Sequence, residues 1–404
     1  MYYLVMRNKN TPRGMLLNDE VLNLSMKLIK DMLGLDSAPN AEYSDEMVVY
    51  HLLNACTSQT SVSQVSDICV DAPSEGDIRY RLRKLDLETV QQALNDKLKI
   101  NAVKTVPRKS QAFAIDFVNI PYYGKEENQG DTIKTKPRQG TSRFYAYASI
   151  YLILRNKRYT LAVKYIRQGE TLKDTIDFLI KEIETFGFKI KGLYLDREFF
   201  TVEVINYLQK RKTPFIIPCV IRGRSGGIRD LFIGRKSYST QYTMHSKNGE
   251  VTFTIHIVVK YSKCKYKTKG IKYFAYATYG MDLPIKKTFK EYRKRFGIES
   301  SYKLMNQARA RTSTKKPVLR LLYVGLSLLL VNIWIYIQWT QLSTPRQGGR
   351  QPRTWTFKNH AKTNHPKNRR KTRIHRQNNT SKPTKSIDNL LKIPKNPRKL
   401  QTNI

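Results

Sequence analysis

Two aspartates stand in positions where carboxylates could share a divalent cation. Asp116 lies in the apolar run Phe-Ala-Ile-Asp-Phe-Val, inside a predicted strand where Asp is disfavoured, so its carboxylate needs a compensating partner. Asp196 ends a second predicted strand, and ligands bind at the carboxyl ends of strands in open α/β sheets. Taken singly, an Asp at a strand end is more often a helix cap or a loop hydrogen-bonding group. The pair, in this strand order, favours a metal site.

A third acid, Glu299, lies in a strongly basic helical segment. At about 100° per residue, five side chains of this segment fall within roughly an 80° arc of one helix face: Tyr292, Arg295, Glu299, Lys303 and Asn306. One acid would then be surrounded by groups that bind phosphate. The alternative is an exposed face held by salt bridges, and Gly297 is a point where the helix can kink.

These residues resemble the DDE transposases of bacterial and archaeal insertion sequences, in the branch with a Tyr-x2-Arg-x3-Glu-x6-Lys signature. Tyr292, Arg295 and Glu299 match its first three positions. Asp116 and Asp196 match the first and second catalytic Asp of the family. A β-rich insertion before the Glu and an apolar helix after the signature are also typical of this branch, and the resemblance covers about residues 15 to 340.

The chain departs from the family pattern at two places. Asn306 occupies the Lys position, so the phosphate contact passes to Lys303 or Arg309 or is lost. Relatives also stack a flipped base on a Trp of the insertion during hairpin formation, and a Tyr would have to take that part here. The Trp residues of this chain lie elsewhere: Trp334, Trp339 and Trp355.

The resemblance implies metal-dependent strand cleavage and strand transfer in cut-and-paste transposition. Asp116 would bridge two Mg²⁺ or Mn²⁺ ions, while Asp196 and Glu299 each complete one site. Tyr292 and Arg295 would position phosphates near the cleavage point. The implied partners are double-stranded DNA, as transposon ends and target, and a second copy of the chain in a homodimer on paired ends.

The acids require a sheet to position them. Alternating apolar residues predict strands at residues 113–118, 144–154 and 159–166, which form an antiparallel meander. A helix capped by Thr171 follows, and then strand, helix and strand alternate to residue 218. This order predicts an RNase H-like α/β catalytic domain over residues 106–340, although other mixed sheets share it.

The preceding region, residues 1–105, is predicted to be helical and to bind DNA. Two short helices between residues 61 and 85 have the spacing of a helix-turn-helix, with basic residues on the second helix. The alternative is a small bundle with a solvated basic face. The basic residues are Arg79, Arg81, Arg83 and Lys84.

Residues 219–280 are predicted to form an inserted β-subdomain. Asn248-Gly249 is a two-residue hairpin signal. Residues 260–267 interleave lysines with tyrosines, which suits phosphate and base contacts but also an ordinary charged strand face.

The uncharged stretch from residue 321 to 337 is long enough to be weighed as a membrane span, yet we favour a buried helix. Residues 341–404 are predicted to be a disordered basic tail. They hold 17 Lys and Arg against one acid, a net charge of +16.

Composition narrows the function classes. A formal charge of +41 over 404 residues indicates a polyanionic partner and argues against an enzyme of small acidic metabolites. The four cysteines form no CxxC pair, and the first residues do not read as a signal peptide, so we expect a cytoplasmic, nucleoid-associated protein without a membrane. Two alternatives stay open: a catalytically inactive DNA-binding derivative of a transposase, and a membrane-attached basic protein.

Overall fold

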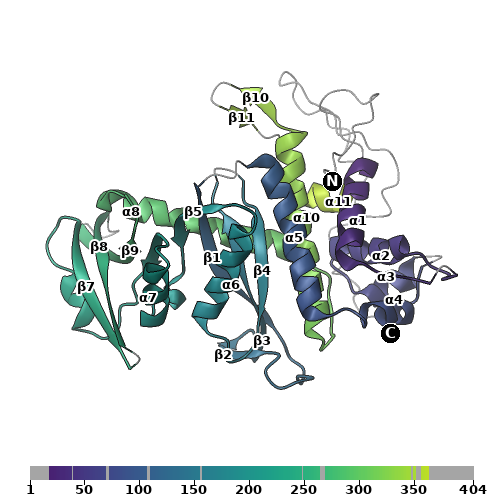
Figure 1. Ribbon diagram of the computed structural model, residues 1–404, viewed down its shortest axis with the longest axis horizontal. Coiled ribbons are helices and arrows are strands. Elements are labelled where there is room, and N and C mark those ends of the chain that lie inside the picture. Colours follow the sequence, from purple (N-terminus) through teal and green to yellow (C-terminus); the bar gives the residue numbers. More distant parts are fainter. Residues whose placement is uncertain are drawn as a thin grey trace, which may run out of the picture.

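The computed structural model describes residues 18–38, 40–69, 72–106, 110–154, 157–247, 249–263, 269–346, 349–351 and 356–363. Within these ranges, a mixed sheet of nine strands runs along the long axis of the molecule, with a cluster of helices at one end (Figure 1). The architecture is therefore α/β, as the sequence predicts.

Five strands form the centre of the sheet. β1 (Ser110–Pro121), β3 (Thr141–Leu152) and β4 (Thr160–Ile166) pair antiparallel, and β5 (Lys189–Tyr194) and β6 (Phe215–Pro218) continue the sheet in parallel with β1. The order is β4-β3-β1-β5-β6. The predicted meander and the two later strands are confirmed.

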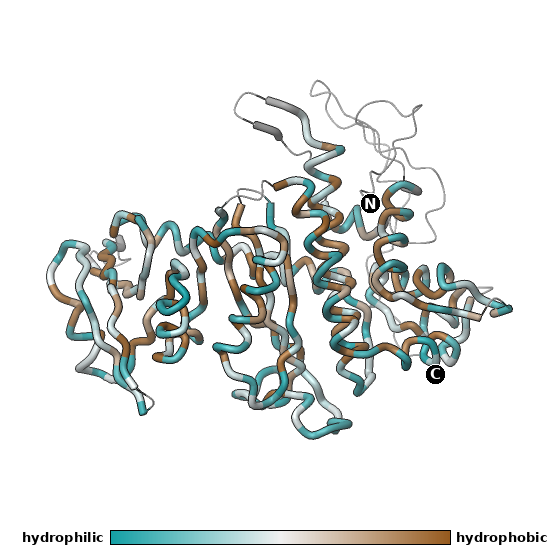
Figure 2. The backbone as a smooth tube through the Cα atoms, in the orientation of Figure 1, coloured by the Kyte–Doolittle hydropathy of each residue, from teal (hydrophilic) through white to brown (hydrophobic). Residues whose placement is uncertain are grey.

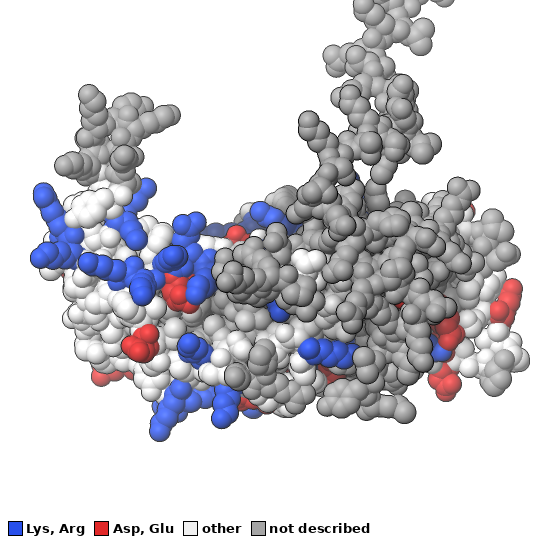
Figure 3. Space-filling model, turned by 90° about the horizontal axis from the view of Figure 1, so that it is seen from above, with Lys and Arg blue, Asp and Glu red and all other residues white. Residues whose placement is uncertain are grey.

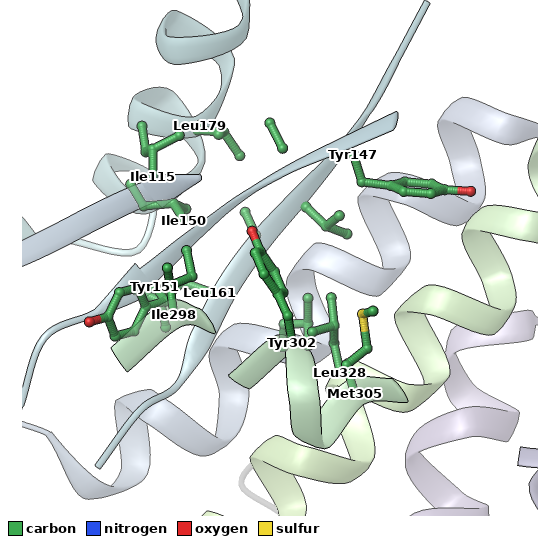
Figure 4. Close-up of a cluster of buried hydrophobic side chains, with 14 of the residues drawn as sticks. Ile115, Tyr147, Ile150, Tyr151, Leu161, Leu179, Ile298, Tyr302, Met305 and Leu328 are labelled. Atoms are coloured by element: carbon green, nitrogen blue, oxygen red, sulfur yellow. The ribbon is translucent and has the colours of Figure 1, made fainter. Parts of the chain in front are cut away.

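Two crossovers connect the parallel strands. α6 (Leu172–Glu184) links β4 to β5, and the backbone N–H of Asp174 donates to the Thr171 hydroxyl at 3.0 Å, the expected cap. The short η1 (Arg197–Phe199) and α7 (Val202–Lys210) lead from β5 to β6. Figure 4 shows Leu179 of α6 on the opposite side of the strands from Tyr302 and Met305, so the sheet is buried on both faces.

One strand was not anticipated. β2 (Ile133–Arg138) pairs antiparallel with β3 at the edge of the sheet. Its sequence, Ile-Lys-Thr-Lys-Pro-Arg, offers one apolar residue, and most of its side chains are exposed. An exposed edge strand leaves no alternating apolar pattern to detect.

The insertion contains η2 (Gly227–Leu231), β7 (Tyr238–Ser246), β8 (Gly249–Lys263) and β9 (Lys269–Tyr279). β9 pairs antiparallel with β6, so these strands extend the central sheet instead of forming a sheet of their own. β7 and β8 meet at the Ser246–Gly249 pair, where the hairpin is expected. Asn248 and residues 264–268 lie outside the described residues.

The first region is helical throughout its described part. α1 (Asn18–Leu33), α2 (Asp45–Ser58), α3 (Val62–Ile68), α4 (Glu75–Leu82) and α5 (Leu87–Thr105) account for it. The predicted short helices α3 and α4 begin at serine caps, where the side chains of Ser61 and Ser74 accept backbone N–H groups.

α5 belongs structurally to the sheet, because its polar side chains satisfy the outer edge of β4. The N–H of Val163 donates to Asn95 Oδ1 at 2.8 Å, and the N–H of Tyr165 donates to Gln91 Oε1 at 2.7 Å. A covered edge cannot pair with another strand. The helical region therefore packs against the central sheet through this helix.

α10 (Pro317–Thr340) completes the same edge. Its Asn332 amide accepts from the N–H of Thr160 at 3.1 Å and donates to the Thr160 carbonyl at 2.7 Å. Among the described residues it is the one helix that is apolar and long enough to cross a membrane. In its most apolar stretch of 18 residues, however, 94% is buried in the protein. Figure 2 shows it as a brown helix beside α5. The prediction of a buried helix is confirmed.

The prediction of disorder from residue 341 onward is wrong for part of the tail. β10 (Thr344–Arg346) and β11 (Gly349–Gln351) form a hairpin, and α11 (Phe357–Thr363) follows. Phe357 is buried, with its ring 5.7 Å from that of Trp334 on α10. A few apolar side chains within a basic sequence suffice to anchor one short helix. Residues 364–404 lie outside the described residues.

Candidate active site

The register of two parallel strands brings the aspartates together. Ala114 of β1 pairs with Tyr194 of β5, and each acid follows two residues later, so Asp116 and Asp196 lie side by side on one face. Asp196 also caps η1, accepting the N–H of Arg197 at 2.7 Å. The centre of the sheet thus presents two neighbouring carboxylates.

The third acid, Glu299, lies on a helix that follows directly after a 3₁₀ segment. α8 (Ile285–Tyr292) leads into the 3₁₀ segment η3 (Arg293–Phe296), and α9 (Gly297–Asn306) follows. The Tyr151 hydroxyl donates to a carbonyl of η3 at 2.8 Å, and a Cβ on Gly297 would lie 2.8 Å from that hydroxyl. The single continuous helix face expected at about 100° per residue is therefore wrong.

Arg295 connects all three acids. Its Nη1 donates to Asp116 Oδ2 at 2.8 Å, and its Nη2 lies 3.6 Å from Asp196 Oδ1 and 3.8 Å from Glu299 Oε1. The Arg295 side chain is only 5% exposed, whereas that of Glu299 is 52% exposed. The predicted acids do converge, and they converge on a guanidinium.

The acid cluster carries excess negative charge, because one guanidinium, that of Arg295, faces three carboxylates. Burial raises the pKa of Asp116 to about 6, and the negative charge of Asp196 also raises it, while the Arg295 guanidinium opposes both effects. A carboxyl poised to gain a proton near neutrality is typical of functional sites. Additional positive charge would favour its ionised form.

Tyr292 holds the neighbouring backbone in place. Its hydroxyl donates to the carbonyl of Leu195, the residue before Asp196, at 3.1 Å. The ring is buried, with its centroid 5.3 Å from that of Tyr276. In this arrangement Tyr292 fixes α8 against β5, and its hydroxyl is already bonded to the protein.

Tyr302 is a site residue that the sequence reasoning missed. Its hydroxyl donates to the main-chain carbonyl of Asp116 at 2.9 Å and lies 2.8 Å from the Ser149 hydroxyl. It follows Glu299 by three residues, so it lies nearby on α9 but faces the sheet (Figure 4). The sequence signal that could have identified it is an aromatic residue on the buried side of α9, opposite the charged residues from which the site was predicted.

The donor set suits Mg²⁺ or Mn²⁺, because all three side chains offer carboxylate oxygens. Among the described residues, however, no three acidic, histidine or cysteine side chains lie close enough to hold a metal ion in the arrangement shown. The guanidinium of Arg295 lies between the carboxylates. Metal binding by these acids therefore requires Arg295 to move.

The remaining predicted residues lie toward the end of α9 and beyond. Lys303 and Asn306 are exposed and Arg309 is partly buried. Asn306 and Arg309 line a cavity of about 600 Å³, and Lys303 does not. Asn306 and Arg309 therefore belong to the cavity, whereas Lys303 lies one helical turn beyond Glu299 on α9.

Two of the four basic residues predicted to contact DNA from α4 form ion pairs within the protein. Arg79 forms an ion pair with Glu75, and Arg81 contacts Asp77 at 3.1 Å and Asp45 at 3.6 Å. Arg83 and Lys84 have no such pair among the described residues. Fewer cationic side chains of α4 are therefore free to contact DNA phosphates than the sequence suggests.

No protein-family model and no curated protein matches the chain. A solved structure of a piggyBac transposase, in a synaptic complex with hairpin DNA, is similar in fold, with a TM-score of 0.51. The similarity covers 88% of this chain and 82% of that one at 12% sequence identity. The chain therefore shares the overall mixed α/β fold of a transposase.

Proposed function

We propose that the chain is a DDE-type DNA transposase that cleaves and joins the ends of an insertion sequence by the cut-and-paste route. The observation that carries the proposal is the convergence of Asp116, Asp196 and Glu299, from two neighbouring strands and a facing helix, on the guanidinium of Arg295. The fold similarity to a transposase supports it.

The topology supports an RNase H-like catalytic domain. Along the chain, three antiparallel strands are followed by two strands that alternate with helices, as expected from the sequence, and their order in the sheet is β4-β3-β1-β5-β6. The first two acids lie on the adjacent central strands β1 and β5, and the inserted strands β7–β9 come between β6 and the helix that carries Glu299.

Two Mg²⁺ or Mn²⁺ ions, held by Asp116, Asp196 and Glu299, would supply activation of the attacking oxygen and stabilisation of the leaving one. The protein's part is to position the carboxylates. Tyr302 fixes the main chain of Asp116, and Tyr292 fixes that of Leu195. Arg295, once free of the acids, would bind a DNA phosphate with its two parallel N–H groups.

The surface beside the acids suits duplex DNA. Figure 3 shows Lys and Arg gathered on one face over the end of the molecule formed by β7–β9 and α8. α8 and η3 carry five exposed cations: Lys286, Lys287, Lys290, Arg293 and Lys294. Such cations would neutralise the phosphates of transposon ends or target DNA next to the acids. A homodimer on paired ends and location at the nucleoid are part of the same proposal.

The test is single-turnover cleavage of a plasmid that carries the inverted repeats flanking the coding region, with Mg²⁺ present. Wild type should cut at the repeat ends. Because loss of a group that only orients a metal ligand already costs about 10- to 100-fold, Asp116→Asn, Asp196→Asn and Glu299→Gln should each slow cleavage by more than about 100-fold. End binding should persist in all three variants.

Asp282→Asn, which changes an exposed acid outside the cluster, is the matched control and should cut normally. Cleavage by Asp116→Asn at a near wild-type rate would refute the assignment of the acids. A wild-type protein that binds the ends but does not cut them would instead indicate the inactive DNA-binding derivative.

A further inference from the structure

A second candidate site lies at the far end of α9. A cavity of about 600 Å³ lies between the end of β1 with its following loop, the C-terminus of α9, and the segment that joins α9 to α10. Its walls include no Asp or Glu. They include four cationic and four tyrosine side chains: Arg309, Arg311, Lys315, Arg320, Tyr122, Tyr123, Tyr147 and Tyr323.

None of the four cations has a carboxylate partner among the ion pairs of the described residues. Arg320 is only 8% exposed, and its guanidinium lies over the rings of Tyr122 at 4.8 Å and Tyr145 at 4.4 Å. Its Nε donates to the Thr314 carbonyl at 2.6 Å. A buried cation without a counter-ion is costly, so the cavity favours an anionic ligand.

The tyrosines add a second kind of contact. The Tyr147 side chain is fully buried, and its hydroxyl has no hydrogen-bond partner in the described structure. Tyr123, in contrast, is 70% exposed at the rim, held by a bond from its hydroxyl to the Gln139 carbonyl at 2.8 Å. The cavity therefore offers an unused polar group inside and an open aromatic face outside.

The cavity is connected to the acid cluster through two elements. Ile120 at its wall follows Asp116 by four residues on β1, which is about 13 Å along a strand. Asn306 at its wall lies one helical turn beyond Tyr302, whose hydroxyl contacts the main chain of Asp116. A strand of DNA leaving the acids along α9 would reach the cavity within two or three nucleotides.

We propose that this cavity binds a single-stranded segment of DNA, with its phosphates on Arg309, Arg311 and Lys315 and a base against the tyrosines. Cations that follow a backbone and aromatic faces that stack bases are the two components of single-strand recognition. A duplex keeps its bases stacked inside and cannot place one against Tyr123. The proposal deepens the proposed function, but the binding itself needs neither metal nor cleavage.

The experiment measures binding by fluorescence anisotropy. The full chain is titrated against a labelled single-stranded DNA ten-mer and its duplex, in EDTA, over a series of salt concentrations. Arg311→Gln/Lys315→Gln removes two exposed cations of the cavity. Lys173→Gln/Lys210→Gln, on α6 and α7, removes the same charge away from it and is the matched control.

The cavity variant should bind the single strand at least about tenfold more weakly than the control. Its plot of log K against log salt should be shallower by about 1.4, since each phosphate contact of a single strand contributes about 0.7. Tyr123→Ala should lose about tenfold and Tyr123→Phe much less, because only the ring stacks. Circular dichroism melting checks that each variant is folded.

Photo-crosslinking with 5-iodouracil in the same ten-mer locates the base. Crosslinks should map to the exposed ring of Tyr123. Crosslinks elsewhere, or equal single-strand binding by the cavity and control variants, would overturn the proposal, and so would an equal loss for the duplex. A protein that fails here but still cleaves in an Asp116-dependent manner leaves the proposed function intact.

Discussion

The two ends of helix α9 present opposite arrangements of charge. Near its start, Glu299 and two strand aspartates surround the single cation Arg295. At its far end, Asn306 and Arg309 line a cavity whose walls carry four cations and no acid. Each end leaves a surplus of one sign in partly buried surroundings, where charge is poorly screened.

The difference indicates what each end would take up. Excess carboxylate attracts a metal ion, and excess guanidinium and ammonium attract phosphate. A helix that carries both would hold the reacting phosphodiester at one end and a strand of the same DNA at the other. The following predictions test this division.

The largest effect is expected at the acid end, from Arg295. Arg295→Gln keeps a hydrogen-bonding group but removes the charge, so cleavage should fall by about 10²- to 10³-fold, as for the loss of an electrostatic contact in a transition state. Arg295→Lys should recover only part of the rate because Lys cannot bind bidentately. Single-turnover cleavage measures both, and a Gln variant as fast as wild type would remove Arg295 from the mechanism.

The next effect concerns the pH dependence of stability without metal. The pKa of Asp116 is about 6 in the folded protein and 3.8 when unperturbed, so the folded state holds this proton more tightly. Stability from this group is present below pH about 4 and is lost as pH rises through 6, by about 2 to 3 kcal/mol.

Urea unfolding in EDTA between pH 4 and 7 checks this prediction. Asp116→Asn, which cannot ionise, should gain stability relative to wild type across that range, while Asp282→Asn should track wild type. If the free energy of unfolding changes with pH in the same way for wild type and Asp116→Asn, the pKa of Asp116 is not raised in the folded protein.

The smallest effect is expected at the cavity end. Asn306→Lys adds a fifth cation to the cavity wall, so single-strand binding should tighten by about threefold at moderate salt while cleavage changes little. Lys303→Ala, on the same helix but outside the cavity, should instead reduce cleavage if Lys303 makes the phosphate contact. If Asn306→Lys accelerates cleavage about tenfold, the family's lysine function belongs at this position and the division of α9 is wrong.

Much of the fold could be predicted from the sequence because its signals are local. The strands around Asp116 and Asp196 alternate in hydropathy. A capping residue such as Thr171 indicates where a helix begins. The sequence left open whether β1 and β5 are neighbours, and the structure pairs them in parallel. The strand signals nominate Asp116 and Asp196, whereas Glu299 is nominated by the basic segment around it and by the resemblance to the DDE transposases.

What could not be predicted depends on contacts distant in sequence. The 3₁₀ segment before α9 is bonded to the hydroxyl of Tyr151, far away in sequence on β3, and a regular repeat of about 100° per residue does not describe it. Asn332 is a polar residue within the apolar helix α10, and its side chain completes the hydrogen bonds of β4. Tyr302 and the acid-free cavity likewise arise only when β1, α9 and the segment after it are packed together.

The most direct test of the central claim is a crystal structure of the protein with a cleaved DNA end and Mn²⁺, with data collected for the anomalous scattering of manganese. We predict anomalous peaks within about 2.2 Å of carboxylate oxygens of Asp116, Asp196 and Glu299, with Arg295 turned from the acids onto a DNA phosphate. Absence of a peak at these carboxylates, with Arg295 still between them, would contradict the assignment of the site.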